Sequence, residues 1–239
     1  MRTDRKPNEL REVKIITDYT KYAEGSVLCC FGDTRVICTA MAEEKAPGRL
    51  KGSGSGWLSA EYNMLPSANA ERKTRDISKL RLDARSAEIQ RLIGRSLRSC
   101  INLDILGERT IWIDCDVIQA DGGTRVASVT GGFVALYLAV QRLMEQKLIR
   151  INPIKFFMAA VSVGIVEDEL LCDLCYREDS AAMMDMNVVM NERGEFIELQ
   201  ATAEGRCAKK AEMNSLLELA QNGIFEIIKE QKKALGVLK

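Results

Sequence analysis

The chain has 239 residues, of which 46% are hydrophobic and 28% are charged, and only four are proline. These values are typical of a globular protein and exclude a disordered or collagen-like chain. The 34 basic and 34 acidic residues cancel, so a polyanion would have to bind to a local cluster of positive charge. The sequence contains no histidine, which excludes Ser-His-Asp and Cys-His catalysis, histidine-ligated zinc and imidazole as a general base.

The cysteines and the hydrophobic segments indicate where the protein is expected to act. Residues 1–7 are charged and no apolar segment of a secretory signal follows them. No segment is expected to approach the roughly 20 apolar residues of a membrane span. The eight cysteines lie mostly in apolar segments, which favours buried thiols in the cytoplasm or another reducing compartment. Cys172 and Cys175 form a single Cys-x-x-Cys pair without histidine, so no zinc site is expected there.

Strands and an arginine-rich helix are predicted in the first half of the chain. Apolar and β-branched residues predict strands at 13–16, 26–31 and 34–42. Segment 47–56 is glycine-rich and is expected to be a flexible connection. A phosphate-binding P-loop is the alternative, although the Lys-Ser/Thr of that motif is missing. Apolar residues then recur at helical spacing, which predicts an amphipathic helix over 79–100.

Basic side chains gather on this helix and in the loop before it. The polar faces of the helix carry several arginines, among them Arg85. Such a face is in most proteins simply solvated, so the helix alone leaves the role of Arg85 open. The preceding loop contains Arg72, Lys73 and Arg75, where side chains can reach a phosphodiester backbone.

The second half is predicted to add strands and two further helices. Alternating polarity predicts a strand at 110–119, and a long apolar helix follows over about 126–146. Four more strands are predicted at 156–166, 169–174, 184–190 and 196–201, and a charged helix over about 210–232. Because no Pro/Ser-rich linker interrupts this order, we expect one domain over residues 1–239, a mixed α/β arrangement of the α+β class.

A phosphate-binding turn is predicted between the strand at 110–119 and the helix after it. The residues there are Asp121, Gly122, Gly123, Thr124 and Arg125. Such a turn can direct backbone N–H groups and the positive end of a helix dipole at an anion, and an arginine adds a fork suited to phosphate. The alternative is an ordinary glycine turn with a surface arginine.

Carboxylates near the end of the chain form a candidate metal site. If the strands around them pair antiparallel, Asp179 and Asp185 approach each other. Two carboxylates without histidine suit Mg²⁺ or Mn²⁺, which prefer oxygen ligands and retain waters. The alternative is acidic residues that decorate a hairpin. A phosphate turn, arginines and a carboxylate metal site together suit phosphoryl or nucleotidyl transfer.

Several segments resemble the ribonuclease PH family of phosphorolytic exoribonucleases. The similar segments are Gly56–Pro66, Glu88–Arg98, Gly107–Ile111, Ile113–Arg125, Glu178–Met190 and Gln200–Gly205. The resemblance runs from about Arg2 to the final helix. It implies a fold like that of the ribosomal protein S5 domain 2-like proteins, and a six-membered ring built as a trimer of dimers.

The resemblance also implies an activity and its residues. In this family inorganic phosphate attacks the terminal phosphodiester of tRNA precursors, trims extra 3′ nucleotides as nucleoside 5′-diphosphates, and in reverse adds nucleotides. Matching positions assign residues to three roles. Phosphate binding falls to Arg85, Gly123, Thr124 and Arg125, catalysis and metal binding to Asp179 and Asp185, and RNA binding to Arg72, Lys73 and Arg75. Arg72 and Arg75 match a segment that reaches RNA partly from a neighbouring subunit.

The chain departs from the usual family pattern at a few positions. Ala84 precedes the phosphate arginine where glycine is commoner, Ser67 stands where an arginine is frequent, and Met183 and Met184 occupy a stretch that often carries another acid. These departures bear on RNA binding and on the number of metal ligands, but none removes an indispensable residue. The alternative function is a catalytically silent RNA-binding ring subunit, as among relatives in exosome rings; such subunits commonly lose the phosphate arginine or the aspartates, all of which are present here. A hydrolytic nuclease is disfavoured because the sequence offers no obvious general base for water.

Overall fold

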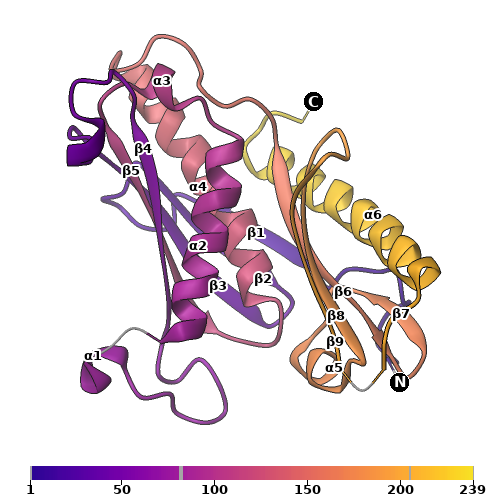
Figure 1. Ribbon diagram of the computed structural model, residues 1–239. Coiled ribbons are helices and arrows are strands. Elements are labelled where there is room, and N and C mark those ends of the chain that lie inside the picture. Colours follow the sequence, from indigo (N-terminus) through magenta and orange to yellow (C-terminus); the bar gives the residue numbers. More distant parts are fainter. Residues whose placement is uncertain (1, 81–82, 205, 239) are drawn as a thin grey trace.

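The computed structural model describes residues 2–80, 83–204 and 206–238 and contains two β-sheets (Figure 1). The first sheet has five strands in the order β1-β2-β3-β5-β4. Its neighbours are antiparallel except for β4 and β5, which run parallel. The strands are β1 (Val13–Thr17), β2 (Gly25–Phe31), β3 (Thr34–Glu43), β4 (Trp57–Met64) and β5 (Thr110–Gln119).

The second sheet has four strands in the order β7-β6-β8-β9, and every neighbouring pair is antiparallel. Asp185 lies at the start of β8, opposite Gly164 of β6 and Thr202 of β9. The strands are β6 (Met158–Val166), β7 (Glu169–Cys172), β8 (Met184–Asn191) and β9 (Phe196–Ala203).

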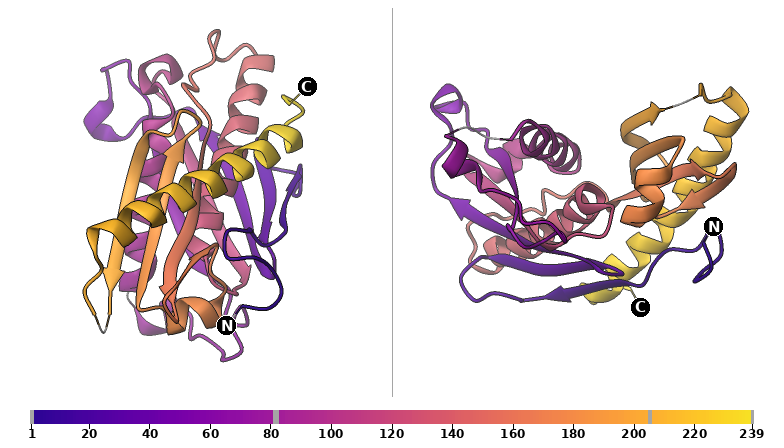
Figure 2. Two further views of the ribbon diagram at one scale, coloured as in Figure 1. Left: turned by 90° about the vertical axis from the view of Figure 1, so that its right-hand side faces the viewer. Right: turned by 90° about the horizontal axis from the view of Figure 1, so that it is seen from below.

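Helices join and cover the two sheets. α4 lies between them and packs against β2, β3 and β6, whereas α2 packs on β4 and α6 covers β6 (Figure 2). The helices are α1 (Asp76–Lys79), α2 (Ala84–Ser99), α3 (Leu103–Leu106), α4 (Thr124–Glu145), α5 (Tyr176–Ala181) and α6 (Lys210–Ala234), with a short 3₁₀ turn η1 (Gly48–Leu50). The mixed α+β class expected from the sequence is confirmed.

The core is built around α4. Val126, Phe133 and Leu136 of this helix are at most 1% exposed. Glycine at position 25 of β2 lets the strand approach α4, because a Cβ atom there would collide with the carbonyl of Ala135. By length and composition alone, α4 is the one helix of the described part of the chain that is apolar enough to cross a membrane. The expectation that no segment approaches a span is wrong on that criterion, but 78% of the helix's apolar window is buried, as in a core helix.

The cysteines are all free thiols, as expected. Cys29, Cys38 and Cys115 lie beneath α4, and the latter two contact the backbone of Ser128. Cys172 lies beneath α6, where its sulfur contacts the carbonyl of Leu219. Burial raises the pKa of the Cys172 thiol to about 12, which makes it a poor nucleophile at neutral pH.

The bounds of α2 and β7 differ from the expectations, and some elements were not expected. α2 begins at Ala84 and not at residue 79, because Asp83 caps it by accepting a hydrogen bond from the backbone N–H of Ser86; Arg81 and Leu82 lie outside the described residues. β7 ends at Cys172, since Asp173 adopts a left-handed backbone conformation with φ 55°. Strand β4 and the short helices α1, α3 and α5 were not expected.

Candidate active site

A cavity of about 330 Å³ lies where the two sheets approach each other. It is lined on one side by the first turns of α2 and α4, and on the other by β6, α5, β8 and the segment after β9. The lining residues are Arg85, Gly123, Thr124, Arg125, Ser162, Asp179, Ser180, Ala182, Asp185, Asn187 and Glu204. The cavity therefore brings together every residue predicted to bind phosphate or metal.

The turn from β5 into α4 forms the floor of the anion-binding side. Gly122 and Gly123 have φ values of 73° and 66°, in the left-handed region that favours glycine. At Gly122 a Cβ atom would lie 2.6 Å from the backbone of Leu174 and Tyr176. No side chain of the described residues caps the first turn of α4, so its N–H groups are available to an anion.

Thr124 is the first residue of α4, and a buried tyrosine fixes its hydroxyl. Its hydroxyl lies 2.8 Å from the hydroxyl of Tyr62, which comes from β4 and is 2% exposed. Burial raises the pKa of Tyr62, although the hydrogen bond to Thr124 and the nearby Arg85 and Arg125 act in the opposite direction. Tyr62 is therefore neutral at physiological pH, and it fixes the position of Thr124.

Arg125 is oriented by two side chains from other elements. Its Nη1 donates to Oε1 of Gln200 on β9 at 2.7 Å and to Oε1 of Glu88 on α2 at 3.3 Å. Nε2 of Gln200 also donates to Glu88, at 3.0 Å. The three side chains close a ring of hydrogen bonds, which holds one edge of the guanidinium at the cavity wall. Arg85 is exposed in the first turn of α2.

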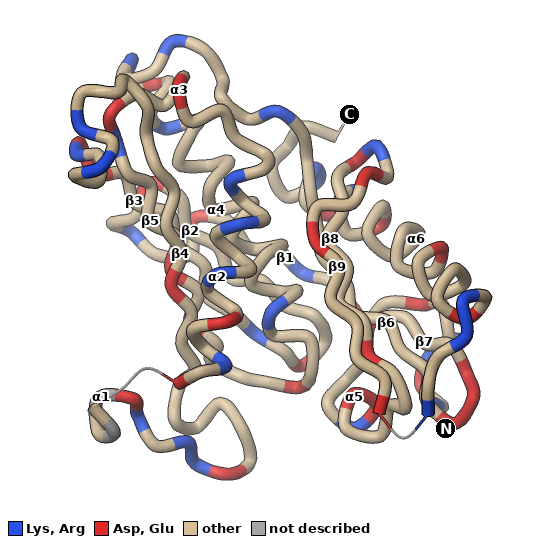
Figure 3. Tube along the Cα trace, viewed as in Figure 1, with Lys and Arg blue, Asp and Glu red and all other residues tan. Residues whose placement is uncertain are grey.

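Asp179 and Asp185 stand on the opposite wall. Asp179 is exposed on α5, yet the protein around the cavity raises its pKa by desolvation, and the charge of Asp185 raises it further. Burial also raises the pKa of Asp185. The charges of Arg85 and Arg125 lower both pKa values but do not cancel the effect. Figure 3 shows this division, with basic positions along α2 and acidic ones at α5 and the end of β9.

This donor set fits a hard divalent cation. Two carboxylates that repel each other inside one cavity gain from a positive ion between them. In the described part of the chain no group of three or more Asp, Glu, Cys or His residues forms a metal cluster. A cation here would have two carboxylate ligands and would keep several waters, which is the usual behaviour of Mg²⁺.

The residues predicted to bind RNA lie away from this cavity. Arg72 and Arg75 are exposed and belong to the loop before α1, and the ammonium of Lys73 lies 3.4 Å from Asp83. In Figure 1 helix α1 lies apart from α5 and the end of β9. Lys73 and Arg75 line a separate hollow of about 280 Å³ with residues of β4 and Asp116. The structure therefore does not bring these basic residues to the cavity formed by a single chain.

The positions that depart from the family pattern have distinct surroundings. Ala84 and Ser67 are exposed. Met184 is 4% exposed and belongs to the hydrophobic core, and Met183 packs against the same core. A charged side chain at position 184 would therefore have to be buried in apolar surroundings, so this position does not offer a further metal ligand.

Comparisons with known proteins identify the family. Domain 1 of the 3′ exoribonuclease family matches residues 9–141, and domain 2 matches residues 157–223. A ribonuclease PH from Syntrophomonas wolfei is 55% identical over 230 residues, which cover 96% of each protein. The chain belongs to the ribonuclease PH family. The predicted family and its activity, phosphorolytic 3′-to-5′ exoribonuclease, are thereby confirmed, whereas the prediction of a single domain stays a prediction.

Solved structures of ribonuclease PH relatives show the same fold. Rice (Oryza sativa) Rrp46 has a TM-score of 0.79 and 17% identity, covering 97% of this chain and 98% of that one. A chain of the Archaeoglobus fulgidus exosome with RNA bound to the active site has a TM-score of 0.80 and 20% identity, covering 95% and 90%. The fold expected from the resemblance is confirmed by these matches.

Some residues of the site were missed from the sequence. Tyr62, Ser162, Glu88 and Gln200 touch or line the site but come from distant segments. For Tyr62, Glu88 and Gln200 the one available signal was that they lie in segments resembling the family. The hydrogen bonds of Glu88 and Gln200 to Arg125 depend on how α2 and β9 pack, which no local pattern reports.

Proposed function

We propose that this ribonuclease PH trims the 3′ ends of tRNA precursors with inorganic phosphate as co-substrate. The observation that supports the proposal is the lining of the cavity. An anion-binding turn and two arginines lie on one side of it, opposite a pair of carboxylates. Among the described residues lining it, the groups that could accept a proton from water are the carboxylates of Asp179, Asp185 and Glu204, and the proposal assigns the first two to a metal ion. Phosphate needs no such base, because it is already an anionic nucleophile at neutral pH.

The residues divide the work of the reaction. Arg85, the N–H groups of Gly123 and Thr124, and Arg125 hold inorganic phosphate, so that one phosphate oxygen attacks the terminal phosphorus of the RNA. The P–O bond to the 3′ oxygen of the preceding nucleotide breaks, and a nucleoside 5′-diphosphate leaves. Such a reaction is accelerated mainly by positioning and by electrostatic stabilisation.

Asp179 and Asp185 would hold Mg²⁺ or Mn²⁺ on the other side of the reacting bond. A cation there would stabilise the negative charge that develops on the leaving 3′ oxygen. Both carboxylates must be ionised to bind it. Because the pKa of each is raised in the free protein, we expect metal affinity to fall at a higher pH than for ordinary aspartates as the solution is acidified.

Assembly into a hexamer, a trimer of dimers, would complete the RNA site. Arg72, Lys73 and Arg75 are directed to solvent or to Asp83 and not to their own cavity, which supports a role at the cavity of a neighbouring subunit. We place the enzyme in the cytoplasm, away from membranes, in line with its free cysteines.

One assay separates this function from its alternative. A tRNA with a short 3′ extension is incubated with the protein and Mg²⁺, with and without inorganic phosphate, and the released nucleotide is identified. Phosphorolysis releases nucleoside diphosphates only when phosphate is present. Release of monophosphates without phosphate would mean hydrolysis, and RNA binding without any release would mean a silent ring subunit.

A further inference from the structure

The two walls of the active site belong to different sheets, so their separation must be fixed by contacts between them. The phosphate-binding turn follows β5 of the first sheet, whereas α5 and its Asp179 follow β7 of the second. Phosphorolysis requires the phosphate and the carboxylates to be held in one geometry, and a displacement of about 1 Å can cost roughly 10²-fold in rate. Neither sheet alone can set this distance.

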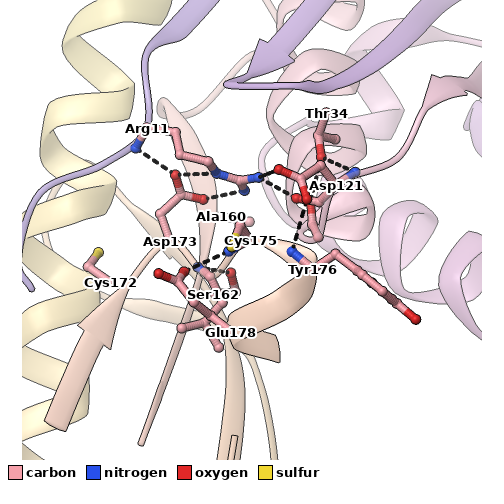
Figure 4. Close-up of polar contacts among 12 residues, drawn as sticks. Arg11, Thr34, Asp121, Ala160, Ser162, Cys172, Asp173, Cys175, Tyr176 and Glu178 are labelled. Atoms are coloured by element: carbon pink, nitrogen blue, oxygen red, sulfur yellow. Dashed lines mark hydrogen bonds and ion pairs between the residues drawn. The ribbon is translucent and has the colours of Figure 1, made fainter. Parts of the chain in front are cut away.

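Arg11 bridges the two walls, because its side chain lies between Asp173 and Asp121 (Figure 4). It lies in the segment before β1 and is 8% exposed. Its Nε and Nη2 donate to the two carboxylate oxygens of Asp173 at 2.9 and 2.7 Å, and its backbone N–H donates to the same side chain at 2.8 Å. Its Nη1 donates to the carbonyl of Asp121, the first residue of the phosphate turn.

The two partners of Arg11 are themselves fixed. Asp173 is fully buried and adopts φ 55°, directly before the segment that leads into α5. The carboxylate of Asp121 accepts a hydrogen bond at 3.3 Å from the backbone N–H of Tyr176, the first residue of α5. Thr34 of β3 donates its hydroxyl to the carbonyl of Gly122 at 2.6 Å and accepts from the N–H of Asp121 at 2.9 Å.

The guanidinium also lies directly under the glycine turn. A Cβ atom at Gly123 would be 3.1 Å from Nη2 of Arg11. The side chain therefore supports the backbone whose N–H groups face the cavity, while Thr34 holds the same turn from the first sheet. Arg11 does not line the cavity in the described residues, so it acts through other groups and not on the substrate itself.

We propose that Arg11 is a positioning residue, which locks the phosphate turn at Asp121 to the α5 wall through its buried ion pair with Asp173. This inference rests on the proposed function of the cavity. It predicts that weakening the bridge shifts the turn and impairs binding of inorganic phosphate, while RNA affinity is set elsewhere. A merely structural ion pair would lower stability without this selectivity.

The test uses two substitutions with different costs. Arg11→Lys keeps the charge and the backbone bond to Asp173 but cannot span Asp173 and Asp121 together. Asp173→Asn keeps the shape, and asparagine tolerates the left-handed conformation. For each full-length variant, we expect the KM for phosphate in phosphorolysis to rise roughly tenfold or more, with the KM for RNA within about twofold of wild type. Inorganic phosphate should also raise the Tm less than in wild type.

A matched control is the pair Lys232–Glu192, which joins α6 to the turn between β8 and β9 at 2.6 Å and contacts neither the phosphate turn nor α5. Lys232→Gln should leave the KM for phosphate unchanged. The proposal is overturned if Arg11→Lys binds phosphate as wild type does, or if Lys232→Gln raises the KM equally. If Asp173→Asn does not fold, Arg11→Lys decides alone. A wild type without phosphorolysis would refute the proposed function, and the phosphate-dependent Tm would still test the bridge.

Discussion

The two walls of the active site differ in whether protein groups alone form a finished ligand site. On the phosphate wall, a glycine turn, an uncapped helix start and two arginines present positive potential that the backbone has already organised. On the carboxylate wall, Asp179 and Asp185 come from separate elements, and the pKa of each is raised above its ordinary value. The first wall is ready for its ligand, whereas the second holds two partly desolvated carboxylates that Arg85 and Arg125 compensate only in part, so an added cation would stabilise it.

The sharpest test of this contrast is Asp185→Asn. It should reduce kcat on the order of 10³-fold or more, since one of two metal ligands is lost. A carboxylate whose folded pKa is raised costs stability at pH values above that pKa, so the neutral amide should leave the Tm unchanged or raise it. Phosphorolysis rates and thermal melts at pH 7 check both parts. Asp168→Asn, at a side chain 85% exposed in the β6–β7 turn, is the control that should keep full activity.

On the opposite wall, Arg125→Ala should lower kcat/KM by about 10²- to 10³-fold, with a large share in the KM for phosphate. The reason is loss of a charged donor that Gln200 and Glu88 hold in place. Arg125→Lys keeps the charge without the planar fork and should fall between wild type and alanine. Steady-state kinetics with varied phosphate measure both. If the alanine variant were as active as wild type, Arg125 would not be part of the phosphate site.

Glu178 extends the comparison because it is next to Asp179 on α5, but its negative charge is compensated by Arg2 and Arg5. Burial raises its pKa, yet hydrogen bonds from Arg2 and from the backbone of Cys175, with the charges of Arg2 and Arg5, lower it to about 2. A depressed pKa stabilises the fold above the ordinary value of 4.5, and this stability is lost as pH falls toward 2. Glu178→Gln should cost about 3 kcal/mol at pH 7.

Denaturant unfolding at a series of pH values tests that assignment. The wild type should lose stability steeply between pH 4.5 and 2, and the Glu178→Gln variant should show a shallower slope in that window. Identical slopes would mean that Glu178 is not the group responsible.

The smallest effect concerns the turn that carries the phosphate wall. Gly122→Ala places a methyl group 2.6 Å from the backbone at Leu174 and Tyr176, at φ 73°. Gly54→Ala is a matched control, because Gly54 has φ 75° and open space around it. Both substitutions place alanine at a positive φ and so have the same backbone cost. The steric contact is specific to Gly122→Ala, which should therefore be less stable than Gly54→Ala by about 1–3 kcal/mol. Urea unfolding of both variants would show equal losses if the close approach were unimportant.

Sequence patterns predicted the features that are local in the chain. Asp121–Arg125 carries its turn glycines, threonine and arginine in one run, directly after an alternating strand. The phosphate wall could therefore be predicted from the sequence. Asp179 and Asp185 were expected to approach each other because their strands would pair antiparallel. That pairing is wrong, since β7 and β8 lie on opposite sides of β6, but the cavity still contains both aspartates.

Contacts between distant segments could not be predicted. The parallel pairing of β4 with β5 and the six-residue helix α5 leave weak patterns in short segments. The bridge through Arg11 joins positions 162 residues apart, and it depends on the left-handed conformation of Asp173 that ends β7 early. The proposed role of Arg72 and Arg75 at a neighbouring subunit depends on contacts between chains, which no pattern along one chain reports.

The buried free thiols beneath α4 and α6 can report, through their rate of chemical modification, when the helix over each sheet detaches. Cys29, Cys38 and Cys115 are sealed under α4, and Cys172 under α6, whereas Cys207 is exposed. A thiol reagent modifies Cys207 at once but must wait for the structure to open before it reaches the others. If the protein unfolds as one unit, both buried sets react at the same rate. Faster labelling of Cys172 would reveal that α6 detaches while the sheet under α4 stays closed.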